Sequence, residues 1–288
     1  MLVTGAAGLL GRRVLQLLSD DGRPTRALAH RREVEGAGEV VWGALEDPAA
    51  LAEAARGVAA VLHLAARTHA RRAADYRRAN VDGTARLLAV AAESGVERFV
   101  HVSTRAVSAR GGAYSVSKLD AEQLVRRAGL EHVIVRLPEV YGGGGHEGID
   151  DMIARAKAGS AIPVVGRGRE LLCPVHIDDA ARALVGALSS PEAAARTYTL
   201  AGECLSQMEV ARACATAFGG RSRIVSVPVP AVAAAAALGR FLPLPVYPDQ
   251  LTRLRGDKPA ASPEAAADLG FRPKDLSAGL SLMAGDTV

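Results

Sequence analysis

The sequence predicts an α/β fold built around a parallel β-sheet. In the first half of the 288 residues, short apolar runs alternate with helical patterns, the order that is typical of β-α-β units. The first run leads directly into the glycine turn Thr4-Gly5-Ala-Ala-Gly8-Leu-Leu-Gly11. Tyr114 and Lys118 stand four residues apart, ten residues after Thr104 ends another apolar run. These features indicate a sheet that binds a ligand at the carboxyl ends of its strands.

The expected strands and helices follow this alternation in order. Strands are expected at 2–4, 25–29, 59–64, 98–102 and 132–135, and helices between them at 9–19, 48–55, 75–94 and 113–128. Leu87, Leu88 and Ala91 give the third helix an apolar face, and Gly95 ends it.

The second half has a less regular pattern. We expect helices at 149–158, 177–188, 206–218 and 263–269 and strands at 171–175 and 197–200. The apolar stretch 224–246 is interrupted by prolines and one arginine, so it predicts a strand, a short helix at 231–238 and a proline-rich loop, not a membrane span. We predict a dinucleotide-binding domain at 1–145 plus segments near 171–202, and an interwoven substrate-binding cap at 146–170 and 203–288.

Composition excludes several classes of protein. The net charge is +4 with scattered arginines and 3% aromatic residues, whereas a nucleic-acid surface needs a basic stripe interleaved with aromatics. The three cysteines lack the spacing of a zinc site or a disulfide framework. We therefore expect buried free thiols, no bound metal, no secretory signal and a cytoplasmic location without a membrane or nucleic-acid partner.

The opening turn has the features of a phosphate-binding site. Gly5, Gly8 and Gly11 permit a tight turn and close approach of the backbone, while the following helix offers N–H groups and its positive dipole end. The alternative is a tight strand–helix turn without a ligand.

The second strand ends in cations. An acidic residue at this point would favour NAD by binding the ribose 2′-hydroxyl, but His30-Arg31-Arg32 stands here. These residues favour the 2′-phosphate of NADP, with NAD and a merely solvated arginine pair as the alternatives.

A hydroxyl, a phenol and an amine follow in the order that carbonyl reduction needs. Tyr114 can exchange a proton with a carbonyl oxygen, and a Lys118 ammonium on the same helical face favours the phenol's anionic form. Thr104 can hydrogen-bond the same oxygen. Ser103 is the competing hydroxyl, and a structural aromatic is the alternative for Tyr114.

The chain resembles the extended short-chain dehydrogenase/reductase family, in its epimerase/dehydratase-like group. The resemblance runs nearly end to end through motifs in family order. They are TGAAGLLG (4–11), VLHLAA (61–66), NVDGTARLL (80–88), RFVHVST (98–104), YSVSK (114–118), RLPEVYG (136–142), PVHIDDAARAL (174–184), YTLAG (198–202) and LGFRP (269–273).

The resemblance implies a fold, a catalytic set and cofactor contacts. It implies a Rossmann-type doubly wound parallel sheet with a small C-terminal substrate-binding domain, catalysis by Thr104, Tyr114 and Lys118, and Asn80 bracing the central strands. Leu64, Ala65 and Ala66 would line the cofactor through their backbone, and Val140 would pack on the nicotinamide. The full set of expected cofactor-binding residues is Gly5, Ala7, Gly8, Leu9, Gly11, His30, Arg31, Leu45, Leu64, Ala65, Ala66, Val102, Tyr114, Lys118, Leu137 and Val140.

Differences from the family's motifs narrow the range of expected substrates. Arg105-Ala106 follows Thr104 where 4,6-dehydratases carry an Asp-Glu pair, so no acid is available there to eliminate water. Leu172-Cys173-Pro174 replaces a diphosphate-gripping arginine segment, and Ala44 replaces an aspartate that touches the adenine. These changes weaken the nucleotide-sugar interpretation.

We therefore expect an oxidoreductase that transfers hydride between NADPH and a ketone or secondary alcohol of a small, rather hydrophobic substrate, similar to the hydroxysteroid dehydrogenase and dihydroflavonol reductase branches. The alternatives are a nucleotide-sugar 4-epimerase or 4-ketoreductase and, from another class, a non-catalytic cofactor-binding regulator or subunit. The resemblance also implies a homodimer formed by the helices at 75–94 and 113–128.

Overall fold

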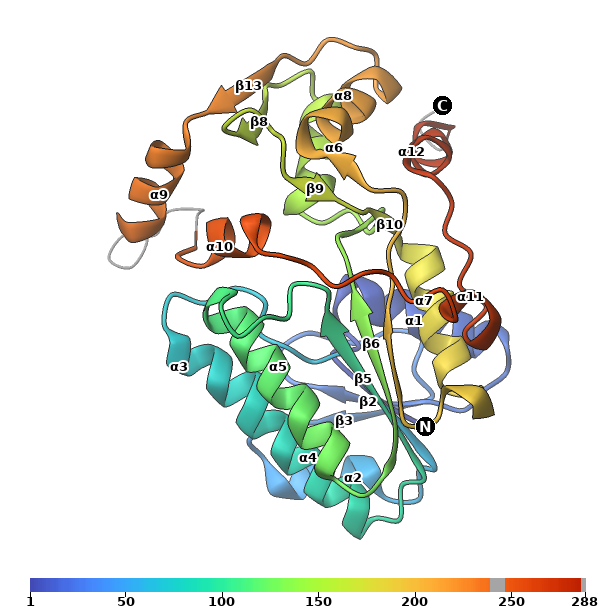
Figure 1. The fold of residues 1–288 in the computed structure, drawn as a ribbon. Helices are drawn as coiled ribbons and strands as arrows, with labels where there is room; N and C mark the ends of the chain where they lie inside the picture. Colours follow the sequence, from blue (N-terminus) through green and yellow to red (C-terminus); the bar gives the residue numbers. More distant parts are fainter. Residues whose placement is uncertain (239–246, 286–288) are drawn as a thin grey trace. The chain divides into compact units, whose positions relative to one another are not determined.

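The computed structural model describes residues 1–238 and 247–285, which form two compact units. Unit 1 comprises 1–137, 181–200 and 256–271, and unit 2 comprises 138–180, 201–255 and 272–288. Both units are therefore assembled from segments that lie far apart in the sequence (Figure 1).

Unit 1 is built on a seven-stranded sheet in which every neighbouring pair is parallel. The strand order is β11-β6-β5-β4-β1-β2-β3. The strands are β1 (Leu2–Thr4), β2 (Arg26–Ala29), β3 (Glu39–Trp42), β4 (Ala60–His63), β5 (Arg98–Thr104), β6 (Glu131–Leu137) and β11 (Arg196–Thr199). The chain order reverses between β1 and β4, and ligands of open α/β sheets bind outside the carboxyl ends of the strands at such a switch point.

Helices cover both faces of this sheet (Figure 1). The helices of unit 1 are α1 (Leu9–Asp20), α2 (Pro48–Ala55), α3 (Ala73–Tyr76), α4 (Gly83–Glu93), α5 (Gly112–Arg127) and α11 (Ala265–Asp268), with a π-helical turn at Arg77–Asp82 and a 3-10 turn at Pro191–Ala193. Asp47 caps α2 by accepting hydrogen bonds from the N–H groups of Ala49 and Ala50. Leu51, Leu87 and Phe99 lie in the apolar core under α2 and α4.

Unit 2 contains shorter elements around its own core. They are β7 (Val140–Tyr141), α6 (Gly148–Lys157), β8 (Ile162–Val165), β9 (Leu171–Leu172), β10 (Val175–His176), β12 (Leu205–Ser206), α8 (Gln207–Ala217), β13 (Ile224–Val227), α9 (Val229–Leu238), α10 (Gln250–Arg255) and α12 (Leu276–Gly285). The strands form three two-stranded sheets, and Ile153, Ile162 and Val210 are central to the core. Helix α7 (Ile177–Ala187) is divided between the units, because residues from 181 onward belong to unit 1.

The predicted fold class is confirmed, whereas the unit boundaries differ from the expected ones. Unit 1 ends its first segment at Leu137, not at 145, and it regains 256–271, which the sequence analysis assigned to the cap. The substrate-binding role of unit 2 stays a prediction.

Two elements of unit 1 differ from expectation. Strand β3 was not predicted, because its four residues form an edge strand without clear alternation. The helix expected at 75–94 is instead α3, a π-helical turn and α4. The wider turn accommodates buried Asn80, whose side chain binds the backbone of Arg67 instead of pointing to solvent.

The single strand expected at 171–175 is two strands, and the expectation of three free thiols is wrong. Cys173-Pro174 separates β9 from β10, since proline lacks the N–H that a ladder needs. Pairing of Leu172 with Leu205 brings Cys173 beside Cys204, and the two form a disulfide. Only Cys214 is a free buried thiol among the described residues. Only one of the three cysteines is therefore a free thiol of the kind from which a reducing compartment was expected.

The expectation for 224–246 is met only in part by the described residues. The strand is β13, and the helix expected at 231–238 begins two residues earlier as α9. The proline-rich loop falls at 239–246, outside the described residues. No helix within 1–238 and 247–285 is long and apolar enough to cross a bilayer.

A buried ion cluster fixes helix α5 to the sheet. The Glu122 side chain is 0% exposed and accepts hydrogen bonds from Ser103 Oγ at 2.7 Å, Arg136 Nη2 at 2.6 Å and Arg126 Nη2 at 3.0 Å. Burial alone would raise the pKa of Glu122, but the hydrogen bonds from Arg136 and Ser103 outweigh it and lower that pKa. One carboxylate thus ties α5 to β5 and β6.

We expect Glu122→Ala to lower the free energy of unfolding by about 3–5 kcal/mol, because Arg126 and Arg136 lose the carboxylate that balances their charges. Because the pKa of Glu122 is lowered in the folded state, its contribution to stability is complete above the ordinary glutamate pKa, and the advantage of wild type over the variant should shrink as pH falls from there through the lowered pKa. Urea denaturation at several pH values measures both effects. Exposed Glu93→Ala is the control, and an equally small effect of both substitutions would contradict the account.

Candidate active site and dinucleotide pocket

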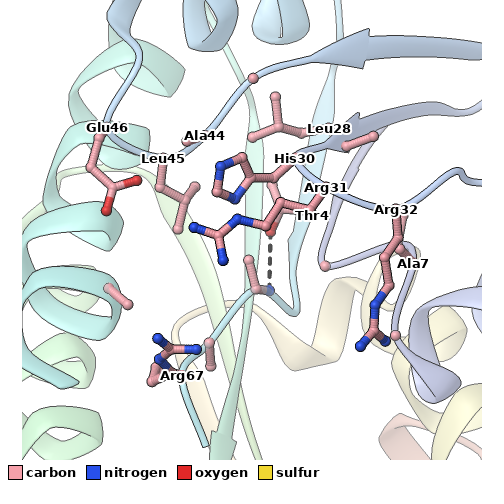
Figure 2. Close-up of a pocket in the computed structure, with 18 of the residues that line it drawn as sticks. Thr4, Ala7, Leu28, His30, Arg31, Arg32, Ala44, Leu45, Glu46 and Arg67 are labelled. Atoms are coloured by element: carbon pink, nitrogen blue, oxygen red, sulfur yellow. Dashed lines mark hydrogen bonds between the residues drawn. The ribbon is translucent and has the colours of Figure 1, made fainter. Parts of the chain in front are cut away.

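A cavity of about 420 Å³ lies at the carboxyl ends of β1, β2 and β4 (Figure 2). Eight of the predicted cofactor residues line it: Gly5, Ala7, Gly8, His30, Arg31, Leu45, Ala65 and Ala66. Sequence reasoning assigned no role in this pocket to several others, namely Thr4, Glu46, Arg67, Asp75, Arg78 and Ala79. Arg32 also lines the cavity, as the His30-Arg31-Arg32 motif implied. Glu46 and Arg67 lie in loops, whereas Asp75, Arg78 and Ala79 lie in α3 and the π-helical turn, and only the tertiary fold brings these segments to the pocket.

The glycine turn packs so closely on neighbouring backbone that it leaves little room for side chains. Gly5 has φ +71°, and a Cβ there would lie 2.6 Å from the amide nitrogen of Ala65. A Cβ on Gly8 would lie 3.2 Å from Gly5 O, and one on Gly11 would collide with the same carbonyl. These contacts require glycine because the turn packs closely on itself and on Ala65, and the tight turn leads directly into the N-terminus of α1, the end of a helix that attracts a phosphate. These residues fit the diphosphate of a dinucleotide.

The part of the pocket that follows β2 is lined by basic side chains. His30, Arg31 and Arg32 follow β2 and are exposed, and Figure 2 shows the side chains of Arg31 and Arg67 among the residues that line the pocket. Arg78 adds a fourth guanidinium to the lining, against two carboxylates, Glu46 and Asp75. This balance of charge suits an additional phosphate.

The remaining predicted cofactor residues lie outside this cavity. Leu9 begins α1, Leu64 donates its N–H to Thr4 O at 3.2 Å, and Leu137 ends β6. Val102 lies in β5, and its carbonyl binds Lys118. Val140 belongs to β7 in unit 2.

The three predicted catalytic residues lie at the end of β5 and along α5 in unit 1. Lys118 is 2% exposed, and its Nζ donates to Val102 O at 2.8 Å, two residues before Thr104. Tyr114 is buried one turn earlier on α5, with its ring edge-on to that of Tyr76 at 5.8 Å. Burial lowers the pKa of Lys118 to about 8, although the nearby charge of Glu122 raises it in part.

The structure separates the two competing hydroxyls. Ser103 Oγ is buried and donates to Glu122, so its proton is already engaged. Thr104 is half-buried, and its Oγ1 accepts from the N–H of Ala106 at 3.1 Å, which leaves its hydroxyl proton available. The catalytic role of Thr104 stays a prediction.

A directional chain of hydrogen bonds leads from the glycine turn into the core. The Ala65 N–H donates to Thr4 Oγ1 at 3.2 Å (dashed in Figure 2), and Thr4 Oγ1 lies 2.7 Å from His63 Nδ1. His63 Nε2 lies 2.9 Å from the Thr84 hydroxyl, which donates to Asn80 O. Since that hydroxyl donates onward, we assign the His63 proton to Nε2. Burial lowers the pKa of His63 to about 3, so it stays neutral.

Asn80 connects the pocket loop to the catalytic helix. Its Oδ1 accepts from the N–H of Arg67 at 2.7 Å, and its Nδ2 donates to Arg67 O at 3.0 Å and to Ser117 Oγ at 2.9 Å. Ser117 Oγ in turn donates to Tyr114 O at 2.7 Å. Asn80 thus braces a loop and α5, not the strands themselves as the resemblance implied.

The arrangement combines a turn suited to a diphosphate with a phenol, an amine and a hydroxyl that are predicted to act on a substrate oxygen. Among residues 1–238 and 247–285, no group of three His, Cys, Asp or Glu side chains could hold a metal ion.

Comparison with known proteins assigns the family. Residues 1–201 match the model of the NAD dependent epimerase/dehydratase family. The ceramide reductase of Caulobacter vibrioides is 32% identical over 247 residues, 82% of this chain and 76% of that protein. The 4-hydroxy-2-methyl-3-oxo-4-farnesyl-3,4-dihydroquinoline-1-oxide ketoreductase of Stigmatella aurantiaca is 37% identical over 166 residues, so the match spans only half of that protein.

A solved structure resembles the chain along nearly its whole length. The structure of MoeE5 in complex with UDP-glucose and NAD has a TM-score of 0.80 at 25% identity, covering 99% of this chain and 97% of that chain. The chain therefore belongs to the NAD dependent epimerase/dehydratase family and is an NAD(P)-dependent oxidoreductase of the extended short-chain dehydrogenase/reductase type.

Proposed function

We propose that this enzyme uses NADPH to reduce a ketone carried on a hydrophobic substrate. The observation that carries the cofactor assignment is the set of cations after β2, with Arg31 and Arg32 where an acidic residue would favour NAD. Arg67 and Arg78 add to the positive charge of the same pocket.

The chemistry follows from the groups at the end of β5. Tyr114 donates its phenolic proton to the ketone oxygen as the carbonyl becomes a carbinol, and solvent restores that proton. Thr104 donates a hydrogen bond to the same oxygen. Lys118 is mostly an ammonium at neutral pH, because its pKa lies near 8, and its charge favours the phenolate left behind. A nicotinamide bound in this pocket supplies the hydride.

Two differences from the family's sequence motifs and the names of two relatives support this substrate class. Arg105-Ala106 offers no carboxylate after Thr104, which argues against dehydration. Leu172-Cys173-Pro174 lacks the cation that would hold a sugar-nucleotide diphosphate. The two relatives named above are reductases whose names specify a ceramide and a farnesyl-bearing ketone, so a long apolar chain on the substrate is the shared chemistry.

A nucleotide-sugar epimerase is the second candidate. It is favoured by the likeness to MoeE5, which was solved with UDP-glucose and NAD. It uses the same phenol and amine, so only the cofactor preference and the substrate separate it from the reductase.

We expect Arg31→Ala to weaken NADPH binding about tenfold and to leave NADH binding unchanged, because one charge-assisted hydrogen bond to the 2′-phosphate is lost. Fluorescence titration of the purified protein with each dinucleotide measures this. Exposed Arg127→Ala on α5 is the control of equal charge. An equal loss for both dinucleotides, or tighter NADH binding by wild type, would contradict the NADPH assignment.

We expect Tyr114→Phe to lower kcat for a ketone that carries a long alkyl chain by about 10²–10⁴-fold while NADPH binding is retained, because only the proton donor is removed. Tyr198→Phe, which removes a hydroxyl bound to Asp268 in the same unit, is the control and should keep its activity. Unchanged turnover in Tyr114→Phe would refute the proposed role. Conversion of UDP-glucose without net oxidation of NADPH would instead establish the epimerase.

A further inference from the structure

His101 is a buried histidine whose position the proposed chemistry does not explain. It lies in β5, level with His63 of the neighbouring strand β4, and it is 0% exposed. Its Nε2 lies 3.3 Å from Lys118 Nζ, and its ring centroid lies 5.4 Å from that of His63. Its Nδ1 is buried and has no hydrogen-bond partner among the described residues.

The contact with Lys118 determines the protonation of this imidazole. Burial, reinforced by the charge of Lys118, holds the pKa of His101 well below its ordinary value, so the ring is neutral. An ammonium can only donate, so Nε2 must accept from Lys118 and the proton must reside on Nδ1. That buried Nδ1–H then lacks a partner, an arrangement that destabilises a fold. The imidazole's one satisfied polar contact is therefore its bond to Lys118.

The same contact completes the surroundings of Lys118 inside the protein. Val102 O accepts a second N–H of the ammonium at 2.8 Å, so one of three donors is left for a ligand. We propose that His101 is a positioning residue, whose neutral imidazole holds the Lys118 ammonium in its charged form and in a fixed orientation at the end of β5. This inference rests on the proposed catalytic role of Lys118.

Several other groups act on Lys118 from the elements packed against it. Glu122 on α5 stabilises the ammonium by its negative charge, and Tyr114 lies one turn away on the same helix. His63 on β4 is neutral, while Arg126 and Arg136 are both bound to Glu122. His101 is thus the neutral acceptor of this set, and replacing it changes no formal charge.

The pKa of Lys118 can be measured directly in the protein without cofactor. The chain contains only four lysines, at 118, 157, 258 and 274, so ¹⁵Nζ-lysine NMR resolves them and Lys118→Met assigns the signal. We expect His101→Phe to lower the Lys118 pKa by about 1, because the ammonium loses an acceptor. His101→Gln, which keeps an acceptor, should restore most of the value. His132→Phe on β6 is the control.

Turnover supplies a second readout. Because the Lys118 ammonium is the active form, kcat for ketone reduction should fall at high pH as Lys118 loses its proton. In His101→Phe this fall should begin at a pH lower by the same amount as the shift of the Lys118 pKa, with KM for NADPH little changed. An unchanged Lys118 pKa and an unchanged fall of kcat at high pH would overturn the inference. If Lys118→Met and Tyr114→Phe keep their activity while His101→Phe still shifts the Lys118 pKa, the proposed function fails and the contact stands.

Wild-type protein tests the same claim without any variant, in case His101→Phe does not fold. Imidazole ¹⁵N shifts of the folded protein report which nitrogen carries the proton. We expect Nδ1–H for His101 and Nε2–H for His63. An Nε2–H tautomer or a charged ring at His101 would overturn the proposal.

Discussion

Helix α5 depends on a stripe of polar side chains that it buries against the sheet. Tyr114, Lys118 and Glu122 recur every four residues, share one face of the helix and are buried, while Arg126, one turn further on, is exposed. Lys118 binds the backbone of β5, and Glu122 binds Ser103 of β5 and Arg136 of β6. Each buried charge is costly unless its partners are in place. This requirement fixes the helix at one register, and the register sets the height of Tyr114 relative to the end of β5.

A second, neutral network joins that helix to the dinucleotide pocket. Thr4 of the glycine turn, His63 of β4 and Thr84 of α4 pass hydrogen bonds in one direction toward Asn80, which also holds the loop at Arg67 and reaches α5 through Ser117. Both buried histidines stay neutral because burial penalises their charged forms. The pocket and the groups proposed to transfer the proton thus share one hydrogen-bonded framework within unit 1.

The sequence predicted the parts that depend on local patterns. The parallel sheet, the glycine cradle and the Tyr114–Lys118 spacing follow from periodicity and motif position, and the fold is as expected. The pairing of Cys173 with Cys204 was missed because 31 residues separate two cysteines that only strand register brings together. Glu46 and Arg67 on loops and Arg78 on the π-helical turn were missed because only the tertiary fold brings them to the pocket. The π-helical turn at Asn80 was missed because its cause is a tertiary hydrogen bond, not a local preference.

The central claim is that the framework of unit 1 directs hydride transfer to a ketone with Tyr114 as the proton donor. Its most direct test is a single turnover with NADPH deuterated at the transferable position and a ketone that carries a long alkyl chain, followed by mass spectrometry of the product. The account predicts one deuterium on the new carbinol carbon and stoichiometric NADP⁺. Deuterium that remains entirely on the nicotinamide, with the ketone unchanged, would contradict it.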